Sequence, residues 1–313
     1  MTDALNQKDF SAYYQQADRL RRENVGDTVH LRAIVEFSNY CRCGCGYCGL
    51  RAGNRNVVRY RMEPSEIIDS VLQAHAVGYK TIVMQSGEDP YFTAEKLGRI
   101  ITDIKSRCDI VITLSCGEMP CEDYAYLKQC GAGRYLLKHE TADRKIYHDL
   151  HPGTNLETRI ACLKNLKKLG YETGSGFMIG LPGQTMQTIV QDILLLKEIG
   201  CDMAGIGPFL PHPHTPLWDL PSGSAEMTKR AVALTRIVLP KINLPATTAL
   251  GVLDMDQKND IFSCGANVIM RKVTPDKYKK HYEIYPSNMD KTDIADERRQ
   301  LEQMICAWGK TPL

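Results

Sequence analysis

The chain has 313 residues, of which 43% are hydrophobic and 24% are charged, the composition of an ordinary globular protein. Its formal net charge is only +2, and no block of five or more Lys or Arg residues occurs, which argues against nucleic acid as the main partner. Because no run of about 18 apolar residues is present, we predict no membrane span. We therefore expect a cytoplasmic location.

The first 27 residues predict a polar helix and lack the apolar region of a signal peptide. After residue 30, short stretches rich in β-forming residues alternate with stretches of helical periodicity. The predicted strands are Leu31–Glu36, Thr81–Gln85, Ile110–Leu114, Tyr135–Lys138, Thr173–Ile179, Met203–Pro208, Ala246–Leu250 and Ala266–Met270.

Helices are predicted between these strands, and glycines follow several of them, as is typical of helix ends. The predicted helices are Pro64–Val77, Thr93–Lys105, Leu156–Leu169, Met186–Ile199, Glu226–Leu239 and a final helix Ile294–Trp308. Eight such β/α units favour parallel pairing and an α/β fold of the TIM-barrel type, a (β/α)8 barrel, which typically needs about 250 residues. We expect one barrel domain over residues 1–313, with the N-terminal helix (1–27) and a C-terminal helical tail (286–313).

Cysteines are numerous, twelve in all, but they are clustered only between residues 41 and 48. Cys41, Cys45 and Cys48 follow the first predicted strand with the spacing C-x3-C-x2-C. Three thiolates on one loop can ligate three irons of a 4Fe-4S cluster and leave the fourth iron open. The amino and carboxylate groups of S-adenosylmethionine (SAM) would fill that position, which predicts a radical SAM enzyme.

Cys43 allows a second interpretation of this loop. Together with the other three cysteines it could close an all-thiolate zinc site, although such sites normally use two separated pairs of ligands. We interpret Cys43 as a bystander. A non-catalytic iron–sulfur carrier or zinc-binding scaffold stays open as an alternative.

Several segments resemble one known family, the HydE maturases of FeFe-hydrogenase, whose sister families are biotin synthase and methylornithine synthase. The resemblance covers residues from about 10 to 285. The segments that carry it are Glu36–Cys41, Tyr47–Arg51, Arg59–Met62, Gln85–Tyr91, Arg134–Ala142, Gly180–Thr185, Gly205–Pro213, Pro245–Ala249 and Cys264–Met270.

The resemblance implies a set of residues that bind SAM. Gly87, Glu88 and Asp89 look like the motif that receives the SAM ammonium group, and a carboxylate there would make a charge-assisted hydrogen bond. Arg159 resembles the arginine that pairs with the SAM carboxylate, a task that suits a planar guanidinium. The other implied SAM contacts are Tyr47 near the adenine, Ser115 and Glu140.

The resemblance also implies a polar patch for anionic substrate groups deeper in the barrel, formed by Thr113, Lys138, Thr247 and Thr248. The residues implied to close the substrate end are Met270, Tyr282 and Tyr285. Two departures stand out: Lys138 replaces an expected Arg, and Arg271-Lys272-Val273 replaces an expected Pro-Asn-Trp run. Cys306 is the only cysteine after Tyr285, so we expect no second cluster.

The implied substrate is a cysteine-bound iron complex with CO and cyanide, made by the partner maturase HydG. The 5′-deoxyadenosyl radical would act at its cysteine sulfur, and the product would pass to the scaffold HydF during assembly of the two-iron part of the H-cluster. A radical SAM mutase or sulfur-inserting enzyme acting on an amino acid remains the enzymatic alternative. Among the histidines, His212-Pro-His214 could suggest a metal site, but we favour a structural or substrate-rim role.

Overall fold

The computed structural model describes residues 1–253, 260–286 and 293–313. Most of the strands are short and lie parallel to one another. They are β1 (Thr28–Ser38), β2 (Thr81–Ser86), β3 (Val111–Ser115), β4 (Ala132–Leu136), β5 (Glu172–Ile179), β6 (Met203–Pro208), β7 (Pro245–Ala246) and β8 (Val268–Lys272). A short β9 (Thr311–Pro312) adds to the start of β1.

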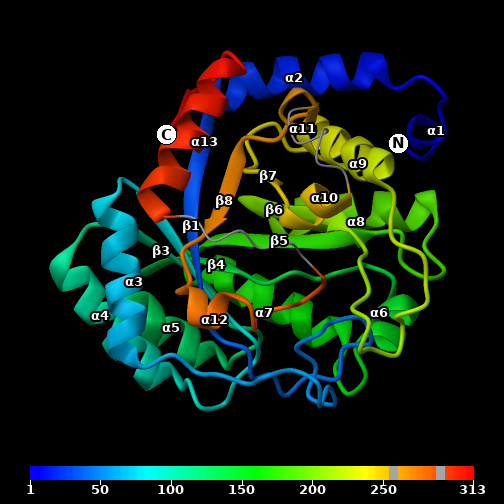
Figure 1. Ribbon diagram of the computed structural model, residues 1–313. Coiled ribbons are helices and arrows are strands. Elements are labelled where there is room, and N and C mark those ends of the chain that lie inside the picture. Colours follow the sequence, from blue (N-terminus) through cyan, green and yellow to red (C-terminus); the bar gives the residue numbers. More distant parts are fainter. Residues whose placement is uncertain (254–259, 287–292) are drawn as a thin grey trace.

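The strands follow one another around a ring that is nearly closed. Each of β2 to β6 pairs with its neighbour in sequence, and β8 pairs with both β1 and β7. Between β7 and β6 the ring is completed by Asn243, whose carbonyl accepts from the Ala204 amide at 2.9 Å and whose amide donates to Asp202 at 2.9 Å. This arrangement confirms the predicted α/β barrel (Figure 1).

Helices on the outside of the ring cover the strands. They are α3 (Pro64–Ala76), α4 (Ala94–Arg107), α5 (Cys121–Gln129), α6 (Arg144–Leu150), α7 (Leu156–Lys168), α8 (Met186–Ile199) and α9 (Ala225–Val238). Their starts are defined by side-chain caps, such as Thr93 on the Lys96 amide and Asn155 on the Thr158 amide. On α4 the buried residues Leu97, Ile101 and Ile104 form the inward stripe that the periodicity predicts.

Strand bounds differ from the predictions by up to three residues, as in β1, and one predicted strand is largely replaced by a helix. The segment predicted as the strand Ala246–Leu250 pairs for only two residues, and helix α10 (Thr248–Leu253) follows at once. Pro245 has no amide hydrogen to donate to a ladder, and the Thr-Ala-Leu-Gly-Val-Leu run is buried on one helical face, which explains the change. β4 begins three residues before its predicted start. Helix α5 ends at Gln129 and Gly131 has a positive φ, so the chain can enter the strand at Ala132.

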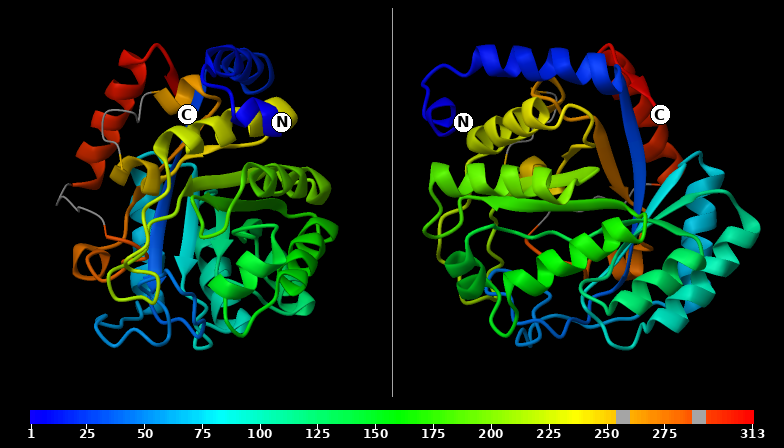
Figure 2. Two further views of the ribbon diagram at one scale, coloured as in Figure 1. Left: turned by 90° about the vertical axis from the view of Figure 1, so that its right-hand side faces the viewer. Right: turned by 180° about the vertical axis from the view of Figure 1, so that it is seen from behind.

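Helices from both ends of the chain pack against the barrel. The predicted N-terminal helix is divided into α1 (Thr2–Leu5) and α2 (Ser11–Val25), and α2 lies across the N-terminal end of the barrel beside α9 (Figure 2). The tail contributes α13 (Ile294–Ala307), while residues 287–292 of the predicted tail lie outside the described residues. The rings of Phe262 on α11 (Asp260–Ser263) and Trp308 stack with centroids 5.4 Å apart.

The opposite end, where the strands finish, is formed by loops. The cysteine loop, residues 39–62, crosses this end, and the short α12 (Asp276–Lys279) lies beside it (Figure 1). In the described part of the chain no helix has the length and apolarity needed to cross a bilayer. The chemistry-bearing segments therefore gather where parallel barrels carry their active sites.

Candidate active site

A cavity of about 380 Å³ fills the barrel from the cysteine loop inward. Every residue predicted from the sequence to contact the cluster, SAM or substrate lines this cavity, with the single exception of Asp89. Much of the remaining wall is apolar and includes Ile34, Val83, Leu136 and Met178. Such a chamber can hold a small molecule away from bulk water.

The cysteine loop is held in place by buried polar side chains. Asn39 is fully buried, donates to the carbonyls of Val58 and His281, and accepts from the Tyr60 amide at 2.7 Å. Arg59 donates to the carbonyls of Asn39, Leu50 (2.9 Å) and Arg51 (2.7 Å). These contacts replace the regular secondary structure that the loop lacks, so the cysteines are presented by a preorganised backbone.

The loop brings Cys41, Cys43, Cys45 and Cys48 to the cavity wall. Burial raises the pKa of Cys48 to about 12, so this thiol stays protonated until a metal displaces the proton. Among the residues described, no three His, Cys, Asp or Glu side chains gather around one point as a single metal ion requires. A donor set of thiols spread along a cavity wall fits a cubane, in which each cysteine binds a different iron.

The loop after β2 passes very close to the cysteine loop. A Cβ atom on Gly87 would lie 2.2 Å from the Tyr40 carbonyl oxygen and 2.7 Å from Cys41 Cβ, and the Gly87 amide donates to Ser38 at 3.0 Å. Only glycine permits this approach. As a result the neighbouring Glu88 is placed directly beside the first cysteine.

Glu88 belongs to a cluster of ion pairs around Arg159. Arg159 Nε lies 2.6 Å from Glu118 Oε1 and its Nη2 lies 3.6 Å from Glu88 Oε1, while the exposed Arg42 approaches Glu88 at 3.3 Å. Burial alone would lower the pKa of Arg159. Tyr147, Glu118 and Glu88 have the larger combined effect and raise that pKa above its usual value. A permanent cation flanked by carboxylates suits the carboxylate and ammonium of an amino-acid group. Glu118 was not found from the sequence.

Glu140 follows β4 and has φ +63°, the one non-glycine residue with positive φ in the described ranges. Backbone hydrogen bonds hold this conformation: the Glu140 amide donates to Gly176 at 2.9 Å, and Met178 donates to Glu140 at 3.0 Å. Glu140 Oε2 pairs with Lys138 Nζ at 2.9 Å. Burial works to raise the pKa of Glu140, but Lys138 and His151 lower it overall, which keeps it a carboxylate. Backbone strain of this kind is often found at functional sites.

Asp89 points away from the cavity. It accepts two hydrogen bonds from Arg61, at 2.7 and 2.9 Å, and one from Ser38 Oγ at 2.6 Å. Burial works to raise its pKa, but Arg61 and Ser38 lower it overall. The structure thus places Asp89 as a tie between the loops that follow β1 and β2, while its predicted contact with SAM stays a prediction.

The remaining predicted SAM contacts, Tyr47 and Ser115, also line the cavity. The Tyr47 ring is buried edge-on against His151 and Phe209, with centroids 5.6 and 6.2 Å apart. Ser115 is the last residue of β3.

The predicted substrate residues line the same cavity, and Tyr282 and Tyr285 lie beside the cysteine loop, where the Gly49 amide donates to the Ile284 carbonyl at 2.9 Å. Thr113 Oγ1 is buried without a hydrogen-bond partner among the described residues, and Thr247 Oγ1 donates to the Ile206 carbonyl at 3.3 Å. Tyr282 accepts a hydrogen bond from Gln85 at 3.1 Å. Lys138, Thr248, Met270 and Tyr285 complete the set on the wall.

Three charged residues of this wall were not found from the sequence. Arg32 is buried, with Nη1 2.8 Å from Met203 Sδ and with Nε unpaired within the described ranges. Lys272 Nζ lies 3.0 Å from Glu36 Oε1. Strand periodicity could have found them, because Arg32, Ile34 and Glu36 alternate on β1 as Val268, Met270 and Lys272 do on β8, and residues two apart share a face.

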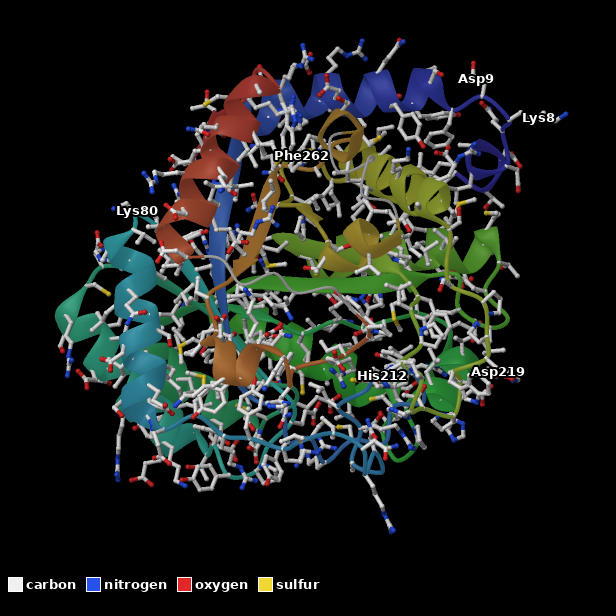
Figure 3. The ribbon with its side chains drawn as sticks, in the orientation of Figure 1. Lys8, Asp9, Lys80, His212, Asp219 and Phe262 are labelled. Atoms are coloured by element: carbon white, nitrogen blue, oxygen red, sulfur yellow. The ribbon has the colours of Figure 1, made fainter. Side chains whose placement is uncertain are left out.

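His212, named in the sequence analysis, and the buried His139 do not line the cavity. His139 is fully buried, with Nδ1 2.9 Å from Ser175 Oγ and Nε2 3.5 Å from Asp192. His212 lies at the loop end of the barrel (Figure 3), where its amide donates to the Tyr47 carbonyl at 3.0 Å and its ring faces Glu283 at 3.7 Å. Both contacts are structural.

Comparisons with known proteins place the chain in a family. Residues 35–196 match the model of the radical SAM superfamily. The [FeFe] hydrogenase maturase subunit HydE of Thermotoga maritima is 50% identical over 287 residues, which cover 91% of this chain and 82% of that protein. The chain is a member of the HydE family of radical SAM enzymes.

Solved structures agree with this assignment at the level of the fold. Methylornithine synthase (PylB) superposes with a TM-score of 0.89 at 22% identity, covering 99% of this chain and 92% of that one. The FeFe-hydrogenase maturase HydG from Carboxydothermus hydrogenoformans gives 0.84 at 23% identity, covering 99% and 74%. Membership of the HydE family implies a 4Fe-4S cluster and SAM as cofactors, and the cavity described above has the donor set and the size class for them.

Proposed function

We propose that the chain performs the HydE step of H-cluster assembly, acting on a cysteine-bound iron complex with CO and cyanide. The observation that carries this proposal is the 50% identity to a HydE maturase along 91% of the chain. The identity includes the barrel whose cavity brings the predicted residues together. When bound, the cluster and SAM together supply a 5′-deoxyadenosyl radical, which would act at the cysteine sulfur of the substrate.

In this proposal Cys41, Cys45 and Cys48 ligate one 4Fe-4S cluster. Their loop is fixed by Asn39 and Arg59, so the thiolates need little rearrangement on binding iron. The fourth iron would face the cavity, where SAM can reach it.

One group of residues on the cavity wall would hold SAM through opposite charges. Glu88 and Glu140 would receive its ammonium and hydroxyl donors, and Arg159 would bind its carboxylate in place of a protein carboxylate. Tyr47 and Ser115 would line the adenosine side. The cavity wall orients the scissile bond and excludes water from the radical.

A second group of residues on the cavity wall would hold the substrate. Thr113, Thr247 and Thr248 offer hydroxyls, and Lys138 and Lys272 offer positive charge to an anionic complex. Met270, Tyr282 and Tyr285 would close the substrate site. A dry chamber protects an oxygen- and water-sensitive iron complex during the reaction.

HydG and HydF are the proposed partners, because the substrate must be delivered and the product removed. HydG would supply the iron complex and HydF would accept the product.

The proposal is tested by anaerobic reconstitution with iron and sulfide, followed by reduction with dithionite in the presence of SAM. We expect 5′-deoxyadenosine from the wild type and from Cys43→Ala, but not from Cys45→Ala, and we expect more of it when HydG product is added. If an amino acid such as lysine stimulates the reaction and the iron complex does not, the mutase alternative replaces the HydE role. If the wild type binds iron but never forms 5′-deoxyadenosine, the carrier alternative holds.

A further inference from the structure

His151 stands between the cysteine loop and the cavity, a position that no predicted role accounts for. It is the residue at the end of α6, is 4% exposed and lines the cavity. Its ring lies between two tyrosines, with centroids 4.6 Å from Tyr147 and 5.6 Å from Tyr47. The ring is therefore held in one orientation.

The two ring nitrogens have different surroundings. Nδ1 lies 3.2 Å from Cys45 Sγ, within the range of a hydrogen bond to sulfur. Nε2 is buried and has no hydrogen-bond partner among the described residues. A buried polar atom without a partner is costly, so its presence in a cavity wall indicates that a ligand supplies the partner.

The chemistry of Cys45 decides which nitrogen carries the hydrogen. A cysteine that ligates iron is a thiolate and only accepts hydrogen bonds, so Nδ1 must donate. A neutral imidazole with its hydrogen on Nδ1 presents a lone pair on Nε2. Nε2 is then an acceptor for a hydroxyl or amino donor in the cavity, and the hydroxyls and amines of SAM are of this class.

We propose that His151 is a positioning residue that joins the cluster to SAM. Its Nδ1–H donates to the cluster-ligating sulfur of Cys45, and its Nε2 accepts a hydrogen bond from SAM. A hydrogen bond to a ligating sulfur withdraws negative charge from the cluster and makes reduction easier. The same ring thereby raises the reduction potential of the cluster and makes a hydrogen bond to bound SAM. This proposal rests on the proposed ligation of the cluster by Cys45.

Two amide side chains separate the functions of the two nitrogens. Asn can place its amide near the position of Nδ1, and Gln can reach the position of Nε2. We expect His151→Phe to lower the midpoint potential of the reconstituted cluster, measured by redox titration with EPR detection, and to weaken SAM binding by roughly three- to tenfold, the size of one lost hydrogen bond. His151→Asn should restore the potential, and His151→Gln should restore SAM affinity.

The matched control is His148→Phe, on the same helix and 80% exposed at its side chain. Iron and sulfide content is measured for every variant, so that only proteins with an intact cluster are compared. Should His151→Phe prevent cluster assembly, the Asn and Gln variants make the same comparison with each other. The inference is overturned if His151→Phe keeps the wild-type potential and SAM affinity, or, where that variant holds no cluster, if His151→Asn and His151→Gln have the same potential and the same SAM affinity. If instead Cys45→Ala still assembles the cluster, the failure lies in the proposed ligand set.

Discussion

Glu36 and Lys272 face each other between β1 and β8, with Oε1 and Nζ 3.0 Å apart. Burial raises the pKa of Glu36 to about 7, and the lowering by Lys272 only partly opposes it. The Glu36 carboxyl is therefore partly protonated near neutral pH and can hold a proton at the cavity wall. Strand periodicity could have identified the pair, because Glu36 and Lys272 lie on the cavity faces of β1 and β8.

The raised pKa of Glu36 predicts a pH dependence of stability. Between pH 4.5, its ordinary pKa, and about pH 7, the folded protein keeps a proton that the unfolded chain has released, so the free energy of unfolding falls as pH rises. Glu36→Gln has no proton to lose. We expect the stability of the wild type relative to this variant to decline by up to about 3 kcal/mol across that window, measured by denaturant titration. A constant difference would contradict the raised pKa.

At the scale of elements, the strand and helix pattern was largely predictable and the loops were not. Period-2 and period-3.6 patterns located most elements, whereas Ala246–Leu250 failed because a strand and a short buried helix are both apolar runs of similar length. The short helices α5 (9 residues) and α6 (7 residues) were missed because they are shorter than the window over which a helical period can be recognised. The paths of the loops depend on contacts such as those of Arg59 with distant carbonyls, which no local pattern encodes.

The contact between the β2 loop and the cysteine loop predicts an intolerance of side chains at Gly87. We expect Gly87→Ala to lower the free energy of unfolding by roughly 1–3 kcal/mol through overpacking, and to reduce iron incorporation, because Cys41 must move. The matched control is Gly133→Ala in β4, where the nearest atom to the new Cβ is 4.0 Å away. Equal stability and equal iron content in the two variants would contradict the close approach.

At the scale of the whole molecule, one cavity brings together the residues proposed to bind SAM and those proposed to bind the substrate. The ion pairs Glu140–Lys138 and Glu36–Lys272 lie on different walls, one after β4 and the other on β1 and β8. The resemblance named most of the SAM and substrate residues from the sequence, and the structure brings them to one cavity wall. The resemblance also named Asp89 as a SAM contact; in the structure its carboxylate pairs with Arg61, and the contact with SAM stays a prediction. The direction in which a side chain points depends on its partners in neighbouring loops, and those partners are distant in the sequence.

The proposed roles of the cavity residues predict that SAM cleavage and substrate binding can be affected separately. We expect Lys272→Met to leave 5′-deoxyadenosine formation without substrate unchanged, and to raise the substrate concentration needed for half-maximal stimulation by roughly tenfold, the effect of one lost charged contact. The exposed Lys280→Met serves as the control. If SAM cleavage without substrate changes while the substrate stimulates it as in the wild type, Lys272 acts on SAM and not on the substrate.

The most direct measurement of the central claim is hydrogenase maturation in a cell-free mixture that contains HydG, HydF and apo-hydrogenase but no HydE. The account predicts that adding the wild-type protein restores hydrogen production, that Cys43→Ala does so as well, and that Cys45→Ala does not. If the wild-type protein forms 5′-deoxyadenosine yet leaves the hydrogenase inactive, the chain is a radical SAM enzyme with another substrate, and the proposed HydE role is contradicted.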